Sequence, residues 1–89
     1  MTREIQLYSV YRHFKGNYYY VEDCATDSES GETVVIYRPL YGERRLWVRP
    51  LSMFLSAVDR QKYPHAEQEY RFEQIDLWHF LYFVIFIIE

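Results

Sequence analysis

The 89-residue chain contains one cysteine, three glycines and three prolines, and these shortages narrow the choice of structure and function. A single cysteine, Cys24, excludes an intramolecular disulfide and favours a reducing compartment, so we expect a cytoplasmic protein. The three glycines stand far apart, which excludes a glycine-rich phosphate-binding loop. The first ten residues have no long apolar core and no cleavage pattern, so no secretory signal is predicted. The length allows one domain.

The sequence also lacks the patterns that most enzymes and metalloproteins need. Its histidines and its cysteine are too widely spaced for a C-x₂-C or H-x₃-H set, so we expect neither a metal nor a cofactor. Glu22 and Asp23 are neighbours on a predicted strand and should point to opposite faces, which argues against paired catalytic carboxylates. Cys24 would need a base and a cationic setting to act as a nucleophile, and only His13 is nearby. We therefore predict that the protein is not an enzyme.

A large excess of charge of one sign is absent as well. The net charge is −3, with +1 over residues 1–62 (nine Lys and Arg against eight Asp and Glu) and −4 over residues 63–89 (one Arg against five acidic residues). A strong nucleic-acid-binding protein usually carries a clear basic excess or stripe. Here basic residues gather only locally, in "RRLWVR" at residues 44–49, so the composition does not favour a strong nucleic-acid binder.

What the sequence has in abundance is aromatic side chains, which make up 20% of it. Such rings favour half-buried positions in β-sheets and binding surfaces. Residues 1–9 show no clear pattern and are expected to be a loosely held lead-in. Segments rich in β-formers and separated by turn residues predict strands at about 18–25, 33–39, 46–50 and 70–75. Helical spacing predicts one or two helical turns over an open end of the sheet, on Leu51, Phe54, Leu55 and Val58.

This order of elements predicts a mainly β fold, a small SH3-like barrel of four to five antiparallel strands with one short helical turn before the last strand. The SH3-like β domain would span residues 10–75, and residues 76–89 would form an apolar C-terminal extension. Alternation on the strand at 18–25 places side chains on two faces, with Tyr18, Tyr20, Glu22 and Cys24 on one and Tyr19, Val21, Asp23 and Ala25 on the other. Apolar residues fall on both faces, as expected for a small barrel.

The segment 77–88, "LWHFLYFVIFII", has a single His among eleven apolar or aromatic residues. As a helix it would be about 18 Å long, short of the roughly 30 Å hydrocarbon layer, so we do not expect a membrane span. Its Phe, Tyr, Val and Ile favour a strand, which would need cover. Three alternatives remain open: the segment packs on the barrel or on a second copy of the chain, it touches a membrane surface, or it has no selected role. The first alternative would include homo-oligomers formed through residues 77–88.

A group of cationic and aromatic residues predicts a binding surface. Trp47 and Arg49 are two apart on a predicted strand and therefore share a face. A ring beside a guanidinium can hold a base, a peptide or a carboxylate by stacking and forked hydrogen bonds. The alternative is that Trp47 fills the barrel and Arg49 pairs with a nearby acid. The predicted binding residues are Tyr11, Arg12, His13, Lys15, Tyr37, Arg38, Trp47 and Arg49.

Several joined motifs resemble a bacterial family known as domain of unknown function 1653. The family pattern runs through "YRHFKG", "Y-x-V", an acidic "S/T-E-x-G-E" turn, "VVYR-x-LYG", "LWVRP-x-x-MF" and a closing "RFE". The resemblance implies a short β domain, SH3-like, with no established reaction and no catalytic residues to transfer. Pro39 departs from the pattern, and so does everything after Ile75. The matching residues are Tyr11 to Gly16, Tyr20 and Val21, Ser28 to Glu32, Val35 to Arg38, Leu40 to Gly42, Leu46 to Phe54, and Arg71 to Glu73.

These observations lead to three hypotheses about function. The first is a small cytoplasmic β-barrel that binds a protein or peptide without catalysis, through a surface that joins residues 11–15 to Trp47 and Arg49. The second is a nucleic-acid-binding module that uses ring stacking and phosphate contacts. The third is an enzyme, which would need a concave pocket with His13 beside Cys24 or a carboxylate.

Overall fold

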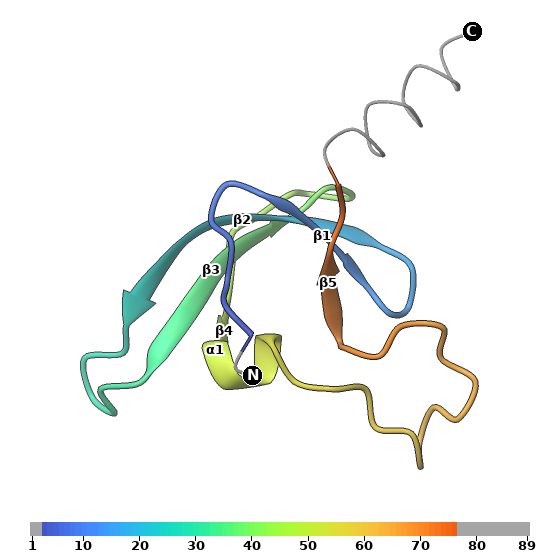
Figure 1. Ribbon diagram of the computed structural model, residues 1–89. Helices are drawn as coiled ribbons and strands as arrows, with labels where there is room; N and C mark the ends of the chain where they lie inside the picture. Colours follow the sequence, from blue (N-terminus) through green and yellow to red (C-terminus); the bar gives the residue numbers. More distant parts are fainter. Residues whose placement is uncertain (1–2, 77–89) are drawn as a thin grey trace, which may run out of the picture.

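The computed structural model describes residues 3–76 as one antiparallel sheet with a single short helix (Figure 1). The strands are β1 (Val10–His13), β2 (Tyr18–Thr26), β3 (Thr33–Pro39), β4 (Trp47–Pro50) and β5 (Phe72–Gln74), and the helix α1 (Leu51–Phe54) lies between β4 and β5. The prediction of a mainly β fold with a short helix before the last strand is confirmed. The strand order is β4-β3-β2-β1-β5, so β4 and β5 form the two edges. The sheet is curled but not closed, and the predicted barrel closure is not seen in residues 3–76.

The long hairpin of β2 and β3 is the part that the sequence predicts best, because its turn has a clear local chemistry. In the turn, the Asp27 carboxylate accepts hydrogen bonds from the amides of Glu29 (2.9 Å) and Ser30 (3.2 Å). Gly31 follows with a φ of +76°, which glycine adopts without a steric penalty. Strand β1 was missed, because it has only four residues and lies directly between the lead-in and the turn at Gly16. It nevertheless pairs with β2 on one side and with β5 on the other.

A β-bulge in β2 overturns the predicted division of its faces. Val21 pairs with Tyr37 and Asp23 pairs with Ile36, so Glu22 is an extra residue without a partner in the ladder. An extra residue shifts the alternation by one place. Cys24 therefore packs against the core, on the side of Tyr19 and Val21, instead of sharing a face with Tyr18. Glu22 and Asp23 also lie on the same outer side, not on opposite faces as predicted.

The core fills the concave side of the sheet above α1 (Figure 1). The rings of Phe54 and Phe72 stack with centroids 4.0 Å apart and planes only 4° from parallel. Tyr11 meets Phe54 edge to face, and its hydroxyl accepts a hydrogen bond from the amide of Gln6. Each large side chain buried in this way stabilises the fold by roughly 1.5–3 kcal/mol. The buried cluster consists of Tyr11, Tyr19, Val21, Val35, Tyr37, Phe54 and Phe72.

The segment before β1 is held firmly, which corrects the expectation of a loose lead-in. The guanidinium of Arg3 donates hydrogen bonds to the carbonyls of Leu55 and Phe72, each at 2.8 Å, and lies 3.9 Å from the centre of the Tyr70 ring. Ile5 packs against the core cluster. These contacts tie the start of the described chain to both the helix and the last strand.

The apolar segment 77–88 lies outside the described residues. The alternatives for this segment, including contact between two copies of the chain, therefore remain predictions. Within residues 3–76 there is no helix of the length and apolar character needed to cross a membrane.

Candidate functional site

The aromatic site is a group of rings on the concave side of the sheet, formed by His13, Tyr19, Tyr37, Trp47 and Phe72 together with the Arg49 side chain. Tyr19, Tyr37 and Phe72 are also members of the buried core. Each residue comes from a different position in the fold. His13 ends β1, Tyr19 lies near the start of β2, and Phe72 begins β5. In β3 and β4, Tyr37 and Trp47 are paired across the ladder. The curl of the sheet brings all five strands together here.

Tyr19 is the centre of the aromatic site. Its ring contacts those of His13, Tyr37, Trp47 and Phe72 and that of Tyr41 in the β3–β4 loop, with centroid distances between 5.5 and 6.3 Å. Its hydroxyl is 2.9 Å from the Tyr41 hydroxyl. Burial, and then the hydrogen bond to Tyr41, raise the pKa of Tyr19. Tyr19 is therefore neutral and hydrogen-bonded, and its ring packs against the more exposed rings of Tyr41 and Trp47.

The outer part of the aromatic site is open to solvent. Trp47 is 44% exposed and Tyr41 is 41% exposed, although Tyr37 beneath them is only 2% exposed. The indole of Trp47 meets Tyr37 edge to face at 6.1 Å. An exposed ring supported from below by other rings can stack on a flat group of a ligand without rearrangement.

Three cationic side chains surround His13. Burial, and then the positive charges of Arg71, Arg49 and Lys15, lower the pKa of His13 from 6.5 to about 4. The ring is therefore neutral at pH 7, and its Nδ1 accepts a hydrogen bond from the Lys15 amide at 3.1 Å. Burial is the larger cause of this low pKa, and the three nearby cations add to it.

Arg49 extends across the open side of the core. Its Nε donates a hydrogen bond to the Tyr37 hydroxyl (3.2 Å), and its guanidinium carbon lies 5.6 Å from the centre of the Phe72 ring. Within residues 3–76, no carboxylate lies within 4.0 Å of a charged nitrogen of Arg49, Arg71 or Lys15. The alternative in which Arg49 pairs with an acid is therefore not observed among these residues.

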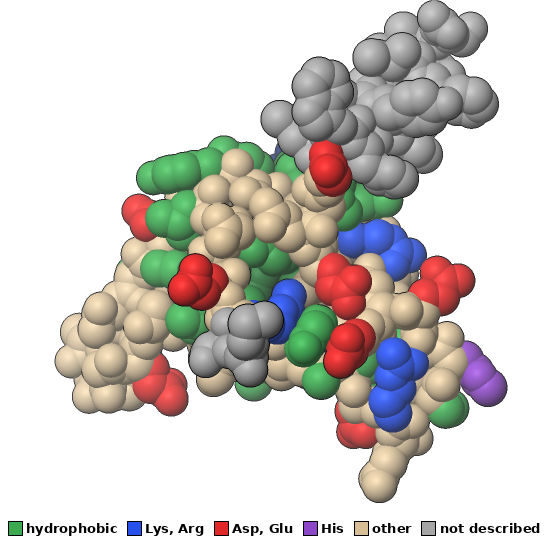
Figure 2. Space-filling view, viewed as in Figure 1, with side chains coloured by type: hydrophobic (Ala, Val, Ile, Leu, Met, Phe, Trp, Pro, Cys, Tyr) green, Lys and Arg blue, Asp and Glu red, His purple; other side chains and the backbone are tan. Residues whose placement is uncertain are grey.

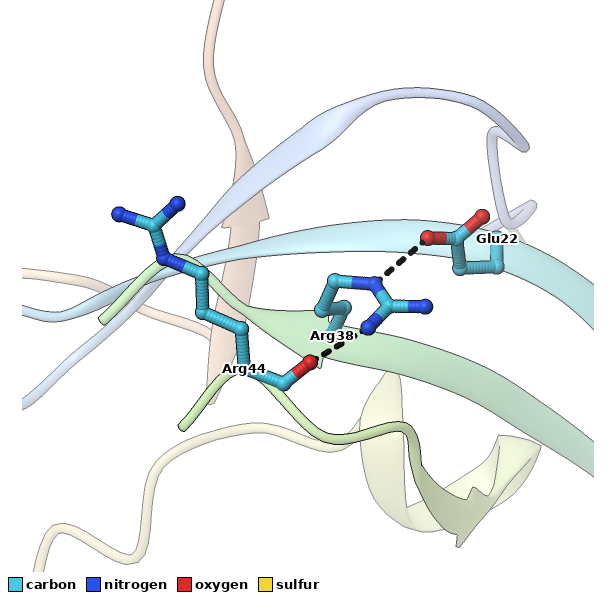
Figure 3. A network of polar contacts seen from close by, with 3 residues as sticks. All are labelled: Glu22, Arg38 and Arg44. Carbon is cyan, nitrogen blue, oxygen red and sulfur yellow. Dashed lines mark hydrogen bonds and ion pairs between the residues drawn. The ribbon is translucent and has the colours of Figure 1, made fainter. Parts of the chain in front are cut away.

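A second feature, the loop pocket, lies beside Trp47. It has a volume of about 250 Å³ and is lined by Pro39, Tyr41, Gly42, Glu43, Arg44, Arg45 and Trp47. Arg38, on the outer side of β3, holds this loop in place: its Nε donates to a Glu22 carboxylate oxygen at 3.0 Å, and its other end donates to the carbonyl of Arg44 (Figure 3). Arg38 therefore positions the loop from outside.

The structure brings only half of the eight predicted binding residues together. His13, Tyr37, Trp47 and Arg49 come together in the aromatic site. Tyr11 is 2% exposed and belongs to the core, and Lys15 lies at the β1–β2 turn, with its ammonium 5.3 Å from the centre of the Tyr63 ring. The other two guanidinium groups point elsewhere. Arg12 donates to the side chain of Gln68, and Arg38 binds Glu22 and the loop.

Sequence reasoning missed four residues of this region: Tyr19, Tyr41, Phe72 and Arg71. Tyr19 stands in a run of three tyrosines, and only the pairing of β2 with β1 and β3 shows which of the three faces the core. Tyr41 is in a loop, where alternation gives no signal. Phe72 and Arg71 are far from the other members in sequence, so only the pairing of β5 with β1 places them here.

The arrangement offers little to covalent chemistry in residues 3–76. Arg12 pairs with Tyr18, and Cys24 is six residues further along β2, so Cys24 lies about 20 Å from the His13 end of β1 at 3.3 Å per residue. Burial, and then the Asp23 carboxylate, raise the pKa of the Cys24 thiol. Groups of three or more histidine, cysteine or acidic side chains suited to a metal ion do not occur in this part of the chain.

Comparison with known proteins places the fold and the motifs in one family. The crystal structure of a DUF1653 protein from Bordetella bronchiseptica matches this chain with a TM-score of 0.67 and 30% sequence identity, over 81% of this chain and 88% of that one. A search of curated proteins gave no match. The resemblance suggested by the motifs is confirmed. Because the family model described as "Protein of unknown function (DUF1653)" matches residues 9–74, a range that contains all five strands and the aromatic site, the chain belongs to this family.

Proposed function

We propose that the protein is a non-catalytic binding module that takes an acidic peptide segment of a partner protein at the aromatic site. One observation carries the proposal: the ring group that includes the half-exposed Trp47 also holds Arg49, against Tyr37 and Phe72, and no carboxylate of residues 3–76 lies within 4.0 Å of the charged nitrogens of Arg49. A cation without a carboxylate partner at a partly dry surface favours an anion. The rings supply apolar contact, and the cation selects a carboxylate.

Binding without catalysis agrees with the state of the reactive groups. His13 is neutral at pH 7, and a histidine among three cations is a poor acceptor of a further proton. The thiol of Cys24 stays protonated because burial disfavours the thiolate. The two groups lie about 20 Å apart by strand geometry, too far for a nucleophile and its base. Glu22 binds Arg38, and Asp23 accepts a hydrogen bond from the Cys24 amide.

A peptide is favoured over a nucleic acid by the charge of the whole molecule. The net charge is −3, and acidic and basic side chains are interspersed on the face shown in Figure 2, with no basic stripe. A nucleic-acid strand needs a positive track along its backbone. Single-stranded nucleic acid is the second candidate, because Trp47 presents an exposed ring close to arginines of the β3–β4 loop, as stacking platforms do.

We also propose that the sheet is an SH3-like barrel left open between β4 and β5. The pairing of β1 with both β2 and β5, and the short helix before β5, support this relationship. The single free cysteine supports a reducing compartment such as the cytoplasm. The opening matters for the proposed function, because Trp47 stays half-exposed on the edge strand β4.

The test is an NMR titration of the full chain with a pool of acidic peptides and, separately, with single-stranded oligonucleotides. We expect the peptides to shift the amides of His13, Tyr19 and Arg49, and Arg49→Gln to weaken binding by at least fivefold. The control Lys62→Gln removes an exposed positive charge outside the site and should leave the affinity unchanged.

Two results would count against the peptide proposal. The first is binding to oligonucleotides at low salt that falls steeply as salt rises, while the peptides shift nothing, since phosphate contacts have that salt dependence. The second is an equal loss of affinity in Arg49→Gln and Lys62→Gln, because this would show only a general effect of net charge.

A further inference from the structure

The loop pocket has the size of one side chain. Its volume is about 250 Å³, and it shares Trp47 with the aromatic site. An apolar cavity of about 150 Å³ accepts a benzene ring, whereas pockets for drug-sized ligands start at about 300 Å³. The loop pocket therefore has room for one ring with its immediate substituents, and an extended ligand on the aromatic site would pass beside it.

Three contacts hold the loop that forms the walls of this pocket. The amide of Leu40 donates to the carbonyl of Tyr18 at 3.0 Å, and the Tyr41 hydroxyl is 2.9 Å from that of Tyr19. Arg38 holds the carbonyl of Arg44 from the outer side of the sheet (Figure 3). Because the loop is held at residues 40, 41 and 44, the pocket exists before a ligand arrives, which lowers the entropic cost of binding.

Arg44 differs from the neighbouring Arg45 in its ion pairing and in its backbone conformation. Arg45 forms an ion pair with Glu43 at 3.0 Å, whereas no carboxylate of residues 3–76 lies within 4.0 Å of the Arg44 guanidinium. In Figure 3 this guanidinium points away from Arg38. Arg44 also has a φ of +58°, a left-handed conformation that glycine or asparagine adopts more readily. An arginine at a backbone position suited to glycine indicates that its positive charge has a functional role.

We infer that the loop pocket binds an aromatic residue of the partner peptide, with the ring against Trp47 and Tyr41 and an adjacent carboxylate on Arg44. This inference rests on the proposed function and specifies its ligand. The carboxylate belongs to the chain end or to an acidic neighbour of the aromatic residue. The guanidinium can hold either group through two parallel hydrogen bonds. The apolar walls suit the aromatic ring, and the Arg44 guanidinium, which has no ion pair within the described chain, suits the carboxylate. A purely apolar side chain is therefore less favoured.

The test uses N-acetyl-L-phenylalanine and its amide as probes in an NMR titration of the full chain. The two probes are nearly the same size and shape, and only the acid carries a negative charge, so their comparison isolates the carboxylate. We expect the acid to shift the amides of residues 40–47 and to bind at least fivefold more tightly than the amide. Acetyl-Phe-Asp-amide as a third probe distinguishes an acidic neighbour from a chain end, and tighter binding of either carboxylate form than of the phenylalanine amide supports the inference.

The decisive variant is Arg44→Gly, because glycine fits the left-handed backbone and removes only the side chain. We expect it to abolish the difference between acid and amide while the loop keeps its shape, and Lys62→Gln to preserve that difference. Equal affinity for acid and amide, or an unchanged preference in Arg44→Gly, would overturn the inference. So would tighter binding of uridine monophosphate than of N-acetyl-L-phenylalanine, since a nucleotide would then be the better ligand.

These outcomes separate the inference from the proposed function. If acidic peptides shift His13, Tyr19 and Arg49 but no probe shifts residues 40–47, the peptide site stands and the loop-pocket inference fails. If neither the peptides nor the probes shift any of these residues, both fail.

Discussion

Protonation of His13 is expected to destabilise the fold as the pH falls below 6.5. The folded protein holds the pKa of His13 at about 4, because of burial and then the charges of Arg71, Arg49 and Lys15, whereas the ordinary value is 6.5. Between pH 6.5 and pH 4, His13 is therefore mostly protonated in the unfolded chain and mostly neutral in the folded chain. The stabilising effect of a neutral His13 is fully present above pH 6.5 and is lost as the pH falls towards 4.

The size of the effect follows from these two pKa values. Between pH 7 and pH 5, the difference in proton uptake lowers the free energy of unfolding by about 1.8 kcal/mol if the whole shift acts on stability. His13 is only partly buried, so solvent screens its neighbours, and we reduce the expected loss to about 1 kcal/mol. In a domain of this size, 1 kcal/mol corresponds to a change in melting temperature of roughly 4–8 °C.

Thermal unfolding followed by circular dichroism at pH 7 and pH 5 measures this loss. Because other groups also titrate, the quantity of interest is the difference between the wild type and His13→Gln. The variant should lose about 1 kcal/mol less than the wild type over this interval. Arg71→Gln should lower the loss as well, since it removes one of the charges that oppose protonation. If His13→Gln loses as much stability as the wild type, His13 does not lie among buried rings and cations as described.

Three further predictions concern the core and the loop. Phe72→Ala removes a ring that stacks on Phe54 at 4.0 Å, and it should lower the free energy of unfolding by about 3–5 kcal/mol in urea denaturation; a loss below 1 kcal/mol would contradict the packing. Arg38→Lys cannot reach both Glu22 and the Arg44 carbonyl, so amide exchange in residues 40–46 should accelerate while global stability changes by less than about 1 kcal/mol. Arg44→Gly relieves a left-handed arginine and should raise stability by up to about 1–2 kcal/mol, seen as a higher melting temperature; a lower one would show that the side chain supports the fold.

The sequence predicted those elements whose signals are local. The hairpin of β2 and β3 has β-branched residues on both sides of a polar turn, and the strand boundaries agree with the predicted ones to within a residue. The helix was expected from the spacing of Leu51 and Phe54, and Phe54 is indeed buried in it. Trp47 and Arg49 were expected to share a face, and both lie on the concave side, opposite Tyr37 and Val35.

What the sequence could not supply depends on register and on distant pairing. The bulge at Glu22 cannot be seen in a run of residues that reads as a regular strand, yet it decides that Cys24 faces the core. Arg12 and Arg38 have the same cationic character as Arg49, and only tertiary contacts direct them to Gln68 and Glu22. The open edge between β4 and β5 depends on how far the sheet curls, which no local pattern records.

The extra residue in β2, Glu22, supplies a carboxylate that supports the β3–β4 loop without changing which residues of the strand face the core. A chain shorter by Glu22 would still direct Tyr19, Val21 and Cys24 inward, because alternation would then run without interruption. It would lose the carboxylate that anchors Arg38, and with it a support of the β3–β4 loop. Loss of this one residue would therefore weaken the support of the β3–β4 loop while the hydrophobic interior keeps the same inward-facing side chains.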